Sequence, residues 1–114
     1  MTRQLILAAA LAVGLFGCGK AQEGHLLYAT EMLLECRFSE AVSAARDVRS
    51  IGPEDSDEFI ASLLIEAVAA ERLGEDPTTL LEEFASLSPS VGSVAEAEEM
   101  ASRSFGRMLA ECPE

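Results

Sequence analysis

Residues 55–74 read DSDEFIASLLIEAVAAERLG, and pairs of apolar side chains recur along them every four residues. The pairs are Phe59/Ile60, Leu63/Leu64 and Ala67/Val68. A step of three to four residues is typical of an α-helix, because it gathers side chains on one face. Asp55 and Glu58 have the spacing of a capping box, and Gly74 is a typical helix stop. Since this is the most apolar segment after residue 18, we predict a helix at the centre of the core.

Four more segments have a helical period, and Gly, Pro or a capping residue stands at nearly every corner. The first predicted helix runs from about Gly24 to Cys36, and the second begins after Ser39 as N-cap and stops at Gly52-Pro53. The last two run from Asp76 (N-cap) and Pro77 (first helical position) to Pro89, and from Ser93, in capping-box spacing with Glu96, to Pro113. Short loops favour antiparallel hairpins. The sequence therefore predicts an all-α fold of about five helices.

The N-terminal residues 1–17 have the three parts of an export signal. Arg3 provides a positive charge, Leu5–Phe16 is apolar, and the small residue Gly17 precedes Cys18. The apolar run has about 12 residues, whereas a membrane-spanning helix needs ~20. We expect a signal peptide at 1–17, with a short membrane anchor or a buried core helix as alternatives.

The residues Leu15-Phe16-Gly17-Cys18 resemble the lipobox of bacterial lipoproteins, in which Leu, a small residue and Gly or Ala precede the cysteine. Phe16 is bulkier than is usual there. The resemblance implies that Cys18 is lipidated, that residues 1–17 are removed, and that the new amino group is acylated. In such lipoproteins Gly at the next position, here Gly19, favours the periplasmic face of the outer membrane. Residues 18–23 would form a tether to the membrane, and 24–114 a helical interaction domain.

The chain has three cysteines. With Cys18 assigned to lipid, Cys36 and Cys112 remain as a pair in an oxidising compartment, each on an apolar helical stripe. A bridge between them would close a loop of about 77 residues and stabilise the fold by ~4 kcal/mol. Two buried free thiols are the alternative. Two isolated cysteines and the single His25 provide no cluster of metal ligands, so we expect no metal.

The charge and the motifs of the chain argue against nucleic-acid binding and against catalysis. The net charge is −12, and it becomes −13 without Arg3, whereas nucleic-acid binding needs Lys and Arg. No Gly-x-Ser-x-Gly, His-Glu-x-x-His or Gly-rich phosphate loop occurs. Acidic pairs such as Glu82-Glu83 flank helix starts or lie on polar faces, where solvated charge is expected. We expect no catalytic residue, cofactor or small-molecule substrate.

Four arginines form two pairs, each on one helical face: Arg46 with Arg49, and Arg103 with Arg107. Salt bridges to the many carboxylates are the favoured interpretation of both pairs. A local basic contact patch on an otherwise acidic protein is the alternative.

The first two predicted helices resemble a tetratricopeptide repeat, a helix–turn–helix unit. Its positions are matched in one register by Phe38 in the turn, by Ala41, Ala45 and Val48 in the second helix, and by Pro53 at the end. His25 stands where the family has Trp, and Asp76-Pro77-Thr78 interrupts a second unit over 59–89. The resemblance implies a groove that binds a peptide or a partner helix. Its lining residues would be Leu26, Thr30, Leu33 and Leu34.

The overall plan also resembles the pilotins, small helical lipoproteins that escort secretin subunits to the outer membrane. In one class of pilotin a disulfide links the first helix to the last, as Cys36 and Cys112 would. We therefore expect a lipid-anchored, non-enzymatic module that binds an envelope protein. A pilotin-type chaperone is the first alternative, and an envelope enzyme is the least favoured one.

Overall fold

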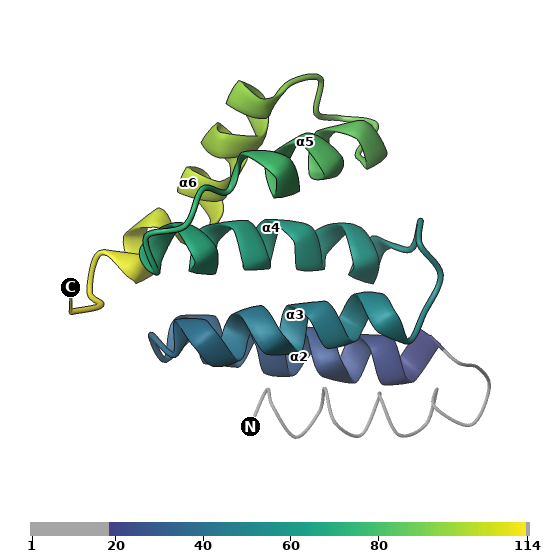
Figure 1. Ribbon diagram of the computed structural model, residues 1–114, viewed down its shortest axis with the longest axis horizontal. Coiled ribbons are helices and arrows are strands. Elements are labelled where there is room, and N and C mark those ends of the chain that lie inside the picture. The colour runs from purple at the N-terminus through teal and green to yellow at the C-terminus, as the bar shows by residue number, and fades with distance from the viewer. Residues whose placement is uncertain (1–18, 114) are drawn as a thin grey trace.

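The computed structural model describes residues 19–113, which form five helices (Figure 1). In chain order these are α2 (Gly19–Leu34), α3 (Phe38–Ser50), α4 (Asp57–Arg72), α5 (Thr78–Leu87) and α6 (Val94–Leu109). None of residues 19–113 is in a strand, so the prediction of an all-α fold of about five helices is confirmed. The predicted signal peptide and Cys18 lie outside the described residues.

The helices are arranged around α4 (Figure 1). Helices α2 and α3 form an antiparallel hairpin that packs against one side of α4, and α5 packs against the other side. Helix α6 contacts both α5 and α4 and runs obliquely to them. No helix within residues 19–113 has both the length and the apolar character needed to cross a bilayer.

Helix α4 is buried on two faces, which confirms that it is the central helix. Ile65, Val68 and Ala69 belong to a buried cluster shared with α2 and α3. Phe59, Leu63, Leu64 and Ala67 belong to a second buried cluster, shared with α5 and α6. The apolar residues of this helix therefore belong to two layers, because a helix with apolar residues around most of its circumference is stable only when it is enclosed.

Three helix ends follow local chemistry. Ser93 accepts a hydrogen bond from the Glu96 amide (3.2 Å), and Glu96 Oε2 accepts one from the Gly92 amide (3.0 Å), so the predicted cap of α6 is confirmed. Gly74 has φ +84°, the left-handed conformation that ends α4. The cap of α4 was predicted wrongly, since Ser56 rather than Asp55 accepts the bond from the Phe59 amide (3.1 Å).

Helix α2 begins at Gly19, five residues before the predicted start, so residues 19–23 are helical rather than an extended tether. The reason is Gln22, which is fully buried. Its amide nitrogen donates to the Val48 carbonyl (3.1 Å), and its amide oxygen accepts from the Ser56 hydroxyl (2.8 Å). Any side chain at Gly52 would overlap Gln22. These contacts hold the first turns of α2 against the connection between α3 and α4.

The turn between α2 and α3 also differs from the prediction. Cys36 lies after the helix with φ +64°, and the amides of Cys36 and Arg37 donate to the carbonyls of Leu33 (3.1 Å) and Met32 (2.8 Å). This is a Schellman motif, with Cys36 at the left-handed position where Gly is usual. Helix α3 then begins at Phe38, with no side-chain cap, so Ser39 is not its N-cap.

We predict that Leu64→Ala lowers the free energy of unfolding by ~2–5 kcal/mol, because Leu64 is only 7% exposed and its truncation leaves a cavity. The same change at Leu34, which is 44% exposed, should cost under about 0.5 kcal/mol. Urea unfolding of both variants measures the difference. A cost below about 1 kcal/mol at Leu64 would contradict the central position of α4.

Candidate functional site

A groove of about 500 Å³ lies between α2, α4 and α6, and the end of α5 closes it. Most of its lining side chains are apolar, and they come from α2, α4, α6 and the end of α5. They are Leu26 of α2, Ile60, Ala61, Leu64 and Ile65 of α4, Phe84 and Pro89 at the end of α5, and Met100 and Phe105 of α6. A concave, largely apolar surface of this size fits the apolar side chains of a ligand or partner.

The polar residues of the groove are mostly hydroxyls: Thr30, Ser88, Ser90 and Ser104. Thr30 donates to the Leu26 carbonyl of its own helix (2.9 Å), and the hydroxyl oxygens of Ser88 and Ser90 lie 3.5 Å apart. Asp57 is the only titratable side chain among the lining residues, all of which belong to the described part of the chain. The groove therefore offers apolar contact and hydrogen bonds, and its lining holds no acid–base pair.

The four residues predicted to contact a partner occupy different environments. Leu26 and Thr30 line the groove. Leu33 is fully buried in the cluster that also contains Leu109 and Cys112, so it is a core residue. Leu34 is largely exposed but is not among the lining residues. The four side chains share one side of α2, yet only Leu26 and Thr30 border the groove.

Sequence reasoning missed the larger part of the groove, which α4 and α6 provide. Ile60 and Phe105 lie on apolar helical faces that the periodicity places in the core, and Met100 was not identified. Each is only partly buried, next to the second cluster. One feature of the sequence could have indicated the groove. The apolar residues of α4 extend around more of its circumference than one neighbouring hairpin can cover.

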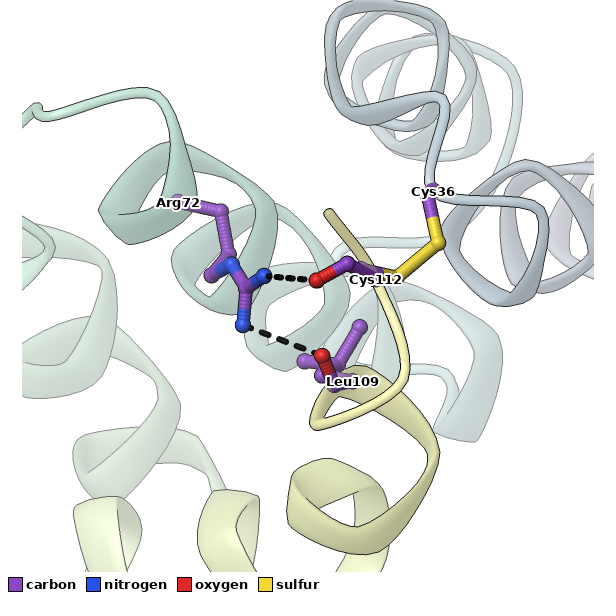
Figure 2. Close-up of a disulfide and its surroundings, with 4 residues drawn as sticks. All are labelled: Cys36, Arg72, Leu109 and Cys112. Atoms are coloured by element: carbon purple, nitrogen blue, oxygen red, sulfur yellow. Dashed lines mark hydrogen bonds between the residues drawn. A yellow bond between two sulfur atoms is a disulfide. The ribbon is translucent and has the colours of Figure 1, made fainter. Parts of the chain in front are cut away.

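A disulfide joins Cys36, in the turn after α2, to Cys112, which follows α6 (Figure 2). The two Cα atoms are 5.6 Å apart, and the cysteines are 76 residues apart in the sequence. This confirms the predicted pairing. The bridge ties the end of α6 to the α2–α3 hairpin, so it helps to determine how α6 crosses α4 and forms one wall of the groove.

Arg72 makes a second connection at the same place (Figure 2). Its guanidinium donates to the carbonyls of Leu109 (3.2 Å) and Cys112 (3.4 Å), and the Leu109 carbonyl also accepts from the Cys112 amide (3.0 Å). It also lies 5.3 Å from the centre of the Phe38 ring, within the range of a cation–π contact. The last residue of α4 therefore holds both the end of α6 and the start of α3.

We expect Cys36→Ser to lower the melting temperature under oxidising conditions, because the unfolded chain loses a long loop closure whose removal costs ~4 kcal/mol. The reduced wild-type protein should melt close to the variant, and reduction should leave the variant unchanged. Thermal unfolding by circular dichroism, with and without dithiothreitol, measures both effects. Equal melting temperatures of the oxidised wild type and the variant would contradict a stabilising bridge.

A buried ion pair connects α3 and α4. The carboxylate of Glu66, whose side chain is 5% exposed, pairs with Arg49 and accepts from Arg46 Nε at 3.1 Å. Arg49 also donates to the Ser62 hydroxyl (3.0 Å), which in turn donates to the Phe59 carbonyl (2.7 Å). The expected salt bridges of Arg46 and Arg49 are thus confirmed. Because every buried polar atom here has a partner, the network is structural.

The two arginines should contribute unequally to stability. Arg49→Met should cost about 3 kcal/mol, because Arg49 is 16% exposed and its loss leaves Glu66 buried beside one partner only. Arg46→Met should cost under about 1 kcal/mol, since that side chain is 64% exposed. Chemical denaturation of the two variants compares them. Equal costs would show that Arg49 is not the principal partner of Glu66.

The described residues contain no candidate metal site, and the comparisons with known proteins found no relative. Within the described residues no three His, Cys, Asp or Glu side chains are grouped so that they could hold a metal ion. The chain matches no protein-family model, no curated protein and no solved structure. The groove between α2, α4 and α6 is the candidate site because its lining is concave and largely apolar.

Proposed function

We propose that this protein is a lipid-anchored, non-enzymatic interaction module of the bacterial envelope, and that its groove binds an apolar segment of a partner protein. The observation that carries the proposal is the groove itself. Its apolar lining combines three buried core residues, Leu64, Ile65 and Phe84, with others that are partly buried or exposed: Leu26, Ile60, Ala61, Pro89, Met100 and Phe105. A concave, largely apolar surface of this kind suits the apolar side chains of a partner.

Two further observations support the location in the envelope. The Cys36–Cys112 disulfide is of a kind that persists in oxidising compartments such as the bacterial periplasm. The lipobox-like residues 15–18 directly precede α2, which begins at Gly19. A lipid on Cys18 would therefore hold the helical domain close to the bilayer, within reach of membrane-bound partners only.

Lipidation is tested by metabolic labelling with a radioactive fatty acid in a bacterial host. The wild-type chain should incorporate the label, and Cys18→Ser should not, because the thiol that accepts the diacylglyceryl group is missing. Cys36→Ser is the matched control and should keep its label. Labelling of Cys18→Ser would reject the lipobox and, with it, the proposed location on the membrane.

The groove is tested by photo-crosslinking in cells. Benzoylphenylalanine at Ser104, an exposed residue of the groove wall, should form an adduct with one envelope protein that mass spectrometry identifies. The same amino acid at Ser43, an exposed residue of α3 outside the groove, should form none. An identical set of adducts from the two positions, or no adduct from Ser104, would reject the groove as the contact surface.

A pilotin-type chaperone is the second candidate, and the disulfide favours it. The bridge links the turn after the first described helix to the residue that follows the last one, which is the plan of one class of pilotin. If the protein escorts a secretin, deletion of its gene should leave the secretin unassembled in the inner membrane. Normal secretin multimers in the outer membrane of the deletion strain would exclude this role.

A further inference from the structure

A second depression, here called the acidic cleft, lies between the second half of α4, the start of α5 and α6, and encloses about 510 Å³. Small and apolar residues form its floor, among them Ala67, Val68 and Leu81. Three carboxylates border it: Glu71 and Asp76 on one side, and Glu98 of α6 on the other. All three are exposed.

The rim of the acidic cleft has a net negative charge. Thr78 donates its hydroxyl (2.6 Å) and its amide (3.0 Å) to Asp76 Oδ1, and these bonds lower the pKa of Asp76, so the carboxylate is charged at neutral pH. Among the lining residues, all of which the structure describes, Arg72 is the only cation. Its guanidinium donates to the neutral carbonyls of Leu109 and Cys112 and keeps its positive charge, so three carboxylates stand against one cation.

The acidic cleft is separate from the groove, because α6 runs between them. Met100 and Ser104 face the groove, whereas Ser102 and Gly106 border the cleft. At 100° per residue these two pairs lie on opposite sides of the helix. A ligand of one depression therefore need not contact the other.

We propose that the acidic cleft is a docking site for a basic segment of a partner protein. Lys and Arg side chains of that segment pair with Glu71, Asp76 and Glu98, and their apolar stems lie on the small, apolar floor. Charge complementarity supports this occupant, since three carboxylates outnumber one arginine at the rim and the whole chain carries −12. The inference goes beyond the proposed function, which requires the apolar groove alone.

Gly106 provides a way to block the acidic cleft without disturbing the fold. A Cβ added there would meet nothing within 4 Å, and Leu is a better helix former than Gly. Gly106→Leu should therefore fill the cleft while the melting temperature stays equal or rises. The double variant Glu71→Gln/Glu98→Gln removes rim charge, and Glu82→Gln/Glu83→Gln removes the same charge from exposed positions of α5 outside both depressions.

The experiment measures binding of a fluorescein-labelled synthetic helix that has Lys on one face and Ala and Gln on the others, so that it offers no large apolar side chain to the groove. The protein is the domain from Gly19 onwards, which contains the described residues of both buried clusters. Fluorescence anisotropy should show binding that weakens with salt. Glu71→Gln/Glu98→Gln should weaken it roughly threefold to tenfold, as expected for two surface ion pairs, and Gly106→Leu should abolish it. Glu82→Gln/Glu83→Gln should change it little.

Several outcomes would overturn the proposal. One is equal weakening by the two double variants, which would mean attraction to overall charge. A second is unchanged binding to Gly106→Leu, and a third is equal binding of a peptide with Glu in place of Lys. A fourth is displacement of the peptide by equimolar spermidine, which would indicate that the site binds a small cation. None of these results affects the crosslinking test at Ser104, because that residue lies on the other side of α6.

Discussion

The enclosure of α4 between two layers is the constraint on which the rest of the structure depends. One of its faces packs on the α2–α3 hairpin and the other on α5 and α6, so both hydrophobic clusters require it. Its one buried carboxylate, Glu66, lies toward α3 and is neutralised there by Arg46 and Arg49. The ion pair therefore also specifies which face of α4 turns toward α3, since the opposite face would bury an unpaired charge.

Helix α6 packs against both clusters and is fixed beyond its C-terminal end by the disulfide, and this arrangement produces the surface features of the molecule. Near its start Ala97 packs with α5 in the second cluster, and beyond its end Cys112 is joined to Cys36. Arg72 binds the last carbonyls of the same segment (Figure 2). Because α6 crosses α4 instead of lying along it, a depression is left on each side of the crossing.

The two depressions differ in chemistry although they share a wall. The groove is apolar with a few hydroxyls, whereas the acidic cleft has three exposed carboxylates around a floor of small residues. Under the two proposals, one face of the module selects apolar side chains and the other selects basic ones. A membrane-anchored protein with two such faces could hold a partner segment in a defined orientation, because each depression accepts one kind of side chain.

Sequence periodicity and local chemistry were sufficient for the elements and for several of their ends. The apolar pairs of α4, the cap at Ser93, the stop at Gly74 and the pairing of Cys36 with Cys112 were all predicted. The apolar pairs, the cap and the stop depend on residues a few positions apart. The cysteine pairing followed because only two thiols remained once Cys18 was assigned to lipid. Patterns over three or four residues are set by the helix itself and can be read directly.

Only the tertiary structure decided where α2 begins, which predicted side chains reach the surface and where the depressions lie. Gln22 extends α2 to Gly19 through partners 26 and 34 residues away, Val48 and Ser56. Leu33 is core and Leu26 lines the groove, although both belong to the same apolar side of one helix. Those outcomes depend on which distant segment covers each position, and a single sequence contains no local signal for that.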